Sequence, residues 1–133
     1  MYSFLVMDHF KNARNSGELP GANAIVRVEN PVCGDMLELS LRIEDQTILE
    51  VRFRAKGCVP TIACASRLTE MIQGAALSDA LAIRRESIIE SLGGIPEASQ
   101  HAAQLSIDAL HSSLNCFSDR AQESPISRTT LPA

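Results

Sequence analysis

The sequence predicts an α+β domain, in which helices pack on one face of a three-stranded antiparallel sheet. Three observations support this prediction: strand patterns precede most of the helical patterns, short turns join the strands, and the two longer strands each have one apolar face. Strands joined by short turns pair as an antiparallel meander. The apolar face of such a sheet has to be covered, and the helices that follow can cover it.

Three strands are expected, and the first covers residues 24–29. The second begins after Asp35 and alternates between apolar and polar residues, as a half-buried strand does. Its expected inward residues are Leu37, Leu39, Leu41 and Ile43. The third follows a turn at 44–46, and its expected inward residues are Leu49, Val51, Phe53 and Ala55.

Helical patterns flank the strands. A first helix is expected over 3–14, where Ser3 can cap the N-terminus. A second begins after Gly57 with Pro60 in its tolerated first turn and ends near 73. Short helices follow at 77–82 and 86–92, and a final helix covers 99–115. The folded domain is therefore expected over residues 1–117, with a polar, proline-rich and disordered tail over 118–133.

The composition argues against several functions. The net charge of −4 disfavours nucleic-acid binding, and an aromatic content of 4% disfavours base stacking. No apolar run reaches the roughly 20 residues that span a bilayer, so no membrane partner is expected. The N-terminus lacks the basic region of a signal peptide. We therefore expect a cytoplasmic location, where cysteines are usually reduced.

Residues of types that commonly bind metals lie where the expected strands and helices begin or end. Cys33 and Asp35 lie between the first two strands, Cys58 lies before the second helix, and His101 lies in the first turn of the last helix. In a sheet-and-helix sandwich these junctions can meet at one edge. Two thiolates, an imidazole and a carboxylate suit iron–sulfur or zinc chemistry better than magnesium or calcium. Gly57 is expected to leave backbone room beside the Cys58 sulfur.

Four segments carry a family resemblance. They are VMDHFKNARNSG at 6–17, NPVCGD at 30–35, FRAKGC at 53–58 with IA and AS shortly after it, and SQHAAQLSIDAL at 99–110. In this order they resemble the motifs of the IscU/NifU-type iron–sulfur cluster assembly scaffolds, over about residues 2–115.

The resemblance implies a non-enzymatic scaffold. In such proteins three cysteines, with an aspartate and a histidine nearby, hold a nascent [2Fe–2S] cluster. A cysteine desulfurase supplies the sulfur, and the cluster passes to recipient apo-proteins. Carried over, Cys33, Cys58 and His101 are expected ligands, while Asp35 is either a ligand or the group that keeps the cluster labile. Whether the chain acts as a monomer or a dimer stays open.

The chain departs from the family pattern at two places. Ala102 stands where the family has its third cysteine, while Cys64 is an additional cysteine. Cys64 lies six residues after Cys58, roughly 240° around a helix, so it is either a buried structural thiol or a substitute ligand or sulfur acceptor. Residues 95–99, IPEAS, replace the family's chaperone-recognition segment LPPVK. The resemblance therefore gives no support for a dedicated Hsp70-type chaperone partner.

The same residues also allow two alternatives to the scaffold. The same four residues could hold zinc tetrahedrally, which would make the chain a zinc-binding regulatory or sulfur-acceptor partner of a cysteine desulfurase. An enzyme that uses Cys58 as nucleophile and His101 as base would leave Cys33 and Asp35 without a role. No enzymatic activity is therefore expected.

Overall fold

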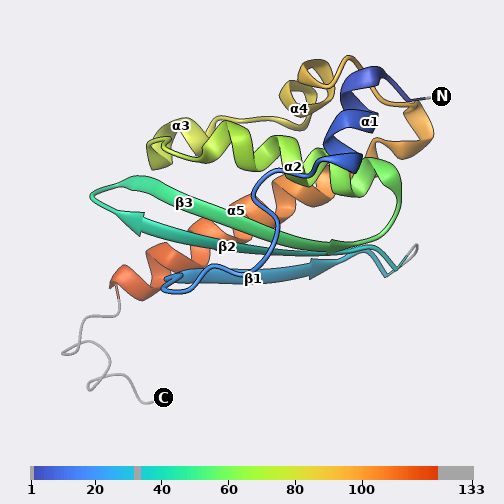
Figure 1. Ribbon diagram of the computed structural model, residues 1–133. Helices are drawn as coiled ribbons and strands as arrows, with labels where there is room; N and C mark the ends of the chain where they lie inside the picture. Colours follow the sequence, from blue (N-terminus) through green and yellow to red (C-terminus); the bar gives the residue numbers. More distant parts are fainter. Residues whose placement is uncertain (1, 32–33, 123–133) are drawn as a thin grey trace.

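The computed structural model describes residues 2–31 and 34–122, with side chains described as far as residue 118. Strands and helices follow each other in the expected order (Figure 1). They are α1 (Phe4–Lys11), β1 (Ala24–Glu29), β2 (Met36–Glu44), β3 (Thr47–Lys56), α2 (Val59–Ile72), α3 (Leu77–Leu81), α4 (Arg85–Ser91), the 3-10 helix η1 (Glu97–Ser99) and α5 (His101–Gln122).

The sheet is an antiparallel meander with the strand order β1-β2-β3, as predicted. Asp45 and Gln46 join β2 to β3 and have φ angles of 51° and 62°. Two consecutive left-handed residues match the right-handed twist of the flanking strands in a two-residue hairpin. This tight turn sets the pairing between the two longest strands.

One inward position expected in β3 is wrong. Leu49 is 36% exposed, whereas its neighbour Ile48 is completely buried. The pairing explains the difference, because Arg42 pairs with Glu50 while Ile43 pairs with Ile48. Leu49 is therefore the extra residue of a β-bulge, which shifts the alternation by one position at the start of the strand.

Helices cover one face of the sheet, as predicted. α5 packs against β1 and β2, α2 packs against β3, and the two helices contact each other. Leu37, Leu39 and Leu41 of β2 are completely buried beneath them, and each contributes roughly 1.5–3 kcal/mol by leaving water. Figure 1 shows α1 lying on the outer side of α2, in a second layer.

The C-terminal ends of α1 and α5 differ most from expectation. α1 ends at Lys11 because the following backbone turns toward α2, where the Arg14 amide donates to Ser66 Oγ at 2.9 Å. α5 runs to Gln122, so residues 118–122 of the expected tail are helical, since a packed helix propagates readily past its last core contact. The rest of that tail lies outside the described residues. Among the described helices, none has the length and apolar character needed to cross a bilayer.

Candidate metal centre

Three of the expected ligand residues meet at one end of the sheet, on the right in Figure 1. The pairing of Met36 with Lys56 places the start of β2 beside the end of β3. Asp35, which precedes β2, therefore lies next to Cys58, which follows β3 and occupies the N-cap position of α2. His101 begins α5 at the same end, and one donor atom from each of the three lies within 4.8 Å of the others.

The oxygen Oδ2 of Asp35 is the centre of this cluster. It lies 3.8 Å from Cys58 Sγ and 3.6 Å from His101 Nε2. His101 Nδ1 lies 3.2 Å from the carbonyl oxygen of Ala98, which can only accept a hydrogen bond. When Nδ1 donates that bond in the neutral imidazole, Nε2 keeps its lone pair free for a metal ion.

The three donors differ in accessibility. The Asp35 side chain is only 8% exposed, whereas that of His101 is 38% exposed and Cys58 is an exposed free cysteine. A buried carboxylate with an exposed sulfur and imidazole forms a site that an incoming reagent can reach. The N-termini of α2 and α5 both face this end, and their positive dipole ends favour anionic ligands.

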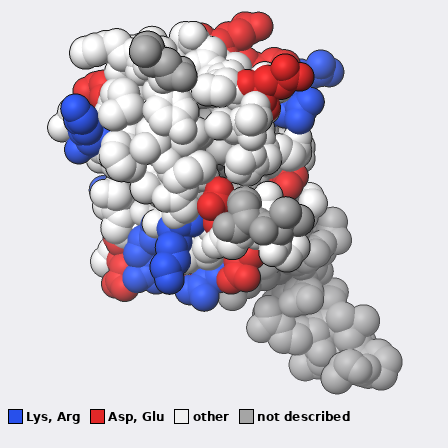
Figure 2. All heavy atoms as spheres, turned by 90° about the vertical axis from the view of Figure 1, so that its right-hand side faces the viewer, with Lys and Arg blue, Asp and Glu red and all other residues white. Residues whose placement is uncertain are grey.

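Figure 2 faces this end of the molecule directly and shows Lys and Arg side chains gathered low on it, over the strands. The exposed basic residues at these strand ends are Arg27, Arg54 and Lys56. Arg27 and Arg54 both pair with Glu38 across the sheet, at 3.5 Å and 2.8 Å, so part of this charge is neutralised locally.

The space at Gly57 serves the aspartate. A Cβ atom built there would lie 2.6 Å from Asp35 Oδ1 and 2.8 Å from Asp35 Cγ. The sequence predicted backbone room beside the sulfur, but in the structure the Asp35 carboxylate fills that space. Glycine at this position therefore lets the carboxylate pack directly against the backbone that leads into Cys58.

A threonine that the sequence reasoning missed completes the cluster. Thr61 is 1% exposed, and its Oγ1 donates a 2.6 Å hydrogen bond to Asp35 Oδ2. Thr61 Oγ1 also lies 3.2 Å from Cys58 Sγ. The signal was present in the spacing, because residues three apart on a helix share a face. A hydroxyl three residues after the predicted ligand was thus positioned to contact it.

The remaining cysteine positions lie outside the cluster or outside the described residues. Cys33 lies outside the described residues. Cys64 is completely buried, and burial, with a smaller effect from nearby Cys58, raises the pKa of its thiol to about 12. A buried thiol that keeps its proton is a poor ligand or sulfur acceptor, so its burial favours the structural alternative. Ala102 is also completely buried and offers no donor atom.

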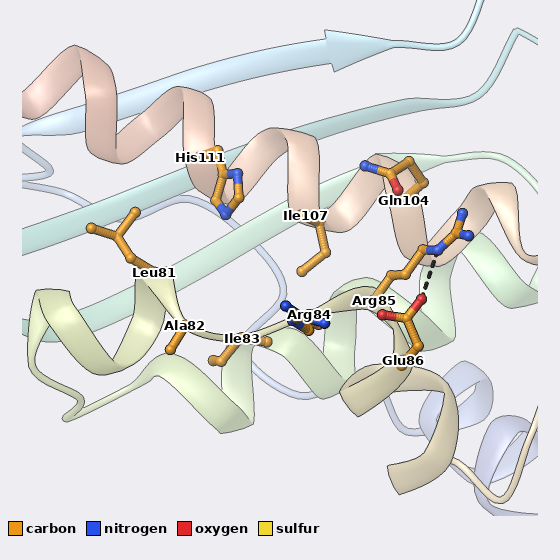
Figure 3. A pocket seen from close by; sticks show the side chains of 9 residues that line it. All are labelled: Leu81, Ala82, Ile83, Arg84, Arg85, Glu86, Gln104, Ile107 and His111. Atoms are coloured by element: carbon orange, nitrogen blue, oxygen red, sulfur yellow. Dashed lines mark hydrogen bonds and ion pairs between the residues drawn. The ribbon is translucent and has the colours of Figure 1, made fainter.

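Hollows lie along α5 in the part of the chain that the structure describes. A smaller one of about 240 Å³ adjoins the cluster and is lined by His101, Gln104 and Asp108 together with residues 29–31. A wider one of about 600 Å³ lies between residues 81–86 and the α5 side chains Gln104, Ile107 and His111 (Figure 3). Its lining contains no thiol, and an ion pair of 2.9 Å joins Arg85 to Glu86 at its edge. The exposed thiol of Cys58 lies instead in the cluster at the end of the sheet.

A helix-covered antiparallel sheet with a thiol, a carboxylate and an imidazole at one accessible end defines a class of small α+β domains with a candidate metal centre of mixed donor type. Within this class the chain belongs to the NifU-like N terminal domain family, which matches residues 1–124. The predicted fold and the family resemblance are thus confirmed.

Named relatives agree with this assignment. The chain is 41% identical over 110 residues to the iron-sulfur cluster assembly scaffold protein IscU 1 of Archaeoglobus fulgidus, covering 83% of this chain and 72% of that protein. It is 39% identical over 112 residues to the iron-sulfur cluster assembly scaffold protein IscU of Aquifex aeolicus, covering 83% and 71%. These names describe scaffold proteins, which agrees with the expected non-enzymatic role.

A solved structure supports the fold independently. The N-terminal part of a nitrogen-fixing NifU-like protein from Brucella abortus superposes with a TM-score of 0.72 at 18% sequence identity. The superposition covers 88% of this chain and 94% of that chain.

Proposed function

We propose that this chain is a scaffold on which a labile [2Fe–2S] cluster is assembled from iron and sulfur and then passed to apo-proteins. The observation that carries the proposal is the convergence of Asp35, Cys58 and His101 at one accessible end of the sheet. The names of the curated relatives support it, since they are described as iron-sulfur cluster assembly scaffolds.

The donor set suits a cluster that has to leave again. A [2Fe–2S] cluster needs four protein ligands, and Cys33, two residues before Asp35, is the proposed fourth. A thiolate is a soft ligand that holds iron–sulfur clusters firmly, while a carboxylate is harder and suits them less well. A mixed set therefore holds the cargo less firmly than four thiolates would.

The proposed partners follow from the same chemistry. A cysteine desulfurase is the proposed sulfur source, and apo-proteins are the proposed recipients. The exposed Cys58 and the partly exposed His101 are the groups that these partners would reach first. We place the reaction in the cytoplasm, where thiols are usually kept reduced.

Anaerobic reconstitution tests the proposal. The protein is incubated anaerobically with ferric iron and sulfide, desalted, and assayed for iron, acid-labile sulfide and zinc per chain. We expect equal iron and sulfide in the wild type, a visible cluster absorption, and transfer of that cluster to an apo-ferredoxin.

Matched variants locate the cluster. Cys58→Ser and Cys33→Ser should each lose most of the bound sulfide. Cys116→Ser, which removes another exposed cysteine, should retain it, and so should Cys64→Ala if that thiol is structural. Bound zinc without sulfide after reconstitution would refute the scaffold and favour a zinc-binding partner of a desulfurase.

A further inference from the structure

The hydroxyl of Thr61 points at the two candidate ligands from within the helix that carries Cys58. It donates to Asp35 Oδ2 at 2.6 Å and lies 3.2 Å from Cys58 Sγ. A threonine hydroxyl in a helix commonly bonds a carbonyl one turn back. Thr69 on the same helix does so, donating to the Ser66 carbonyl at 2.6 Å. Thr61 instead uses its single proton on the carboxylate of Asp35.

We propose that Thr61 is a positioning residue for the cluster site, whose hydroxyl holds the Asp35 carboxylate with Oδ2 facing Cys58 and His101. This inference rests on the proposed function, because it assigns a role within the same site. It concerns a residue that binds no cargo itself and acts through Asp35.

Two contacts restrain the Asp35 carboxylate, one at each of its oxygens. The terminal torsion of an aspartate is broad, so an unrestrained carboxylate samples several orientations. The backbone of Gly57 lies against Oδ1, where even a methyl group would approach to 2.6 Å. The hydroxyl of Thr61 holds Oδ2. One oxygen is thus held by packing and the other by a hydrogen bond.

The hydrogen bond from Thr61 leaves Asp35 Oδ2 able to bind a metal ion. A carboxylate oxygen has two lone-pair sites, and Thr61 occupies one of them on Oδ2. The other stays available to a metal ion between Oδ2, Cys58 Sγ and His101 Nε2, which lie within 4.8 Å of one another. Because its proton is committed to Asp35, the Thr61 oxygen faces Cys58 as an acceptor. The Cys58 thiol can donate to this oxygen at 3.2 Å or to Asp35 Oδ2 at 3.8 Å, until metal binding displaces the thiol proton.

Cobalt(II) titration tests the inference, because cobalt(II) bound by thiolate absorbs in the visible range. Thr61→Val keeps the side-chain shape and removes the hydroxyl. Loss of a hydrogen bond that orients a metal ligand typically weakens metal binding by about 10–100-fold, and we expect a loss of that size. Thr61→Ser should restore affinity close to the wild-type value.

The Asp35→Ala background separates positioning from general structure. If Thr61 acts through Asp35, Thr61→Val should weaken cobalt binding little further once Asp35 is replaced. Thr69→Val is the matched control on the same helix, because its hydroxyl bonds backbone carbonyls away from the cluster. It should leave cobalt affinity unchanged, and thermal unfolding monitors the fold of every variant.

Each outcome decides the question. Wild-type affinity in Thr61→Val, or an equal loss in the presence and absence of Asp35, would overturn the positioning role alone. A wild-type protein that binds neither cobalt nor a reconstituted cluster would overturn the proposed function together with it. Selective loss that serine rescues would establish Thr61 as a positioning residue.

Discussion

Replacing Gly57 by alanine tests how the Asp35 carboxylate is held. Gly57 is not among the residues with positive φ, so its backbone conformation also suits alanine. The substitution therefore adds one methyl group without backbone strain. The new carbon would lie 2.6 Å from Asp35 Oδ1, 2.8 Å from Asp35 Cγ and 3.2 Å from Thr61 Cβ.

The size of the effect follows from these distances. Ordinary contact begins at 3.4 Å, so the methyl group overlaps Oδ1 by about 0.8 Å. A buried carboxylate that retreats by this amount breaks its 2.6 Å hydrogen bond with Thr61. Losing a hydrogen bond to a charged group costs about 1.5–3 kcal/mol of stability. The displaced donor should also weaken metal binding by about 10–100-fold.

Urea unfolding followed by circular dichroism measures the first effect, and cobalt(II) titration measures the second. The control is Gly57→Ala in the Asp35→Ala background, where the methyl group meets no carboxylate and should cost little. Unchanged stability together with unchanged cobalt affinity in the single variant would refute the reasoning, because the carboxylate would then not occupy the space beside Gly57.

Three further predictions concern burial and charge. Burial lowers the pKa of His9 below its ordinary 6.5 despite the nearby carboxylate of Glu70. The unfolded chain therefore binds this proton more tightly, and stability should fall as pH drops below about 6.5, by at most about 1.4 kcal/mol per pH unit. His9→Gln should reduce that slope in urea unfolding between pH 7.5 and 5.5, and an unchanged slope would assign it elsewhere. Ile48→Ala should cost about 2–5 kcal/mol, whereas Leu49→Ala should cost under about 1 kcal/mol; the reverse order would disprove the bulge. Iodoacetamide at pH 8 should label exposed Cys116 in the folded protein and Cys64 only after unfolding, as mass spectrometry can show, and rapid native labelling of Cys64 would contradict its burial.

Much of the fold could be predicted from local patterns. The alternation in β2 indicated Leu37, Leu39 and Leu41 as inward residues, and all three are completely buried. Pro60 marked the first turn of α2, and Ser3 caps α1 by accepting a hydrogen bond from the Val6 amide at 3.1 Å. These features depend on side-chain periodicity and backbone geometry within a few residues, which the sequence carries directly.

The bulge in β3 could not be read from the same alternation. Ile48 and Leu49 are both β-compatible apolar residues, and either one can face the core locally. The choice depends on how β3 pairs with β2, where Ile43 opposes Ile48. Pairing across strands involves residues from two segments at once, so a period-two pattern in one strand does not determine it.

For the candidate site, too, some features follow from the sequence and others only from the tertiary structure. The sequence by itself determined which donors the chain carries and that Asp35, Cys58 and His101 stand at element ends. Only the tertiary structure decided that they converge, that the carboxylate is buried while the sulfur is exposed, and that Thr61 and Gly57 restrain it. The physical reason is the distance along the chain over which each kind of information acts. Residue type and local periodicity belong to a few neighbouring positions, whereas the position of a carboxylate between two helices and a strand end depends on packing between segments distant in the chain.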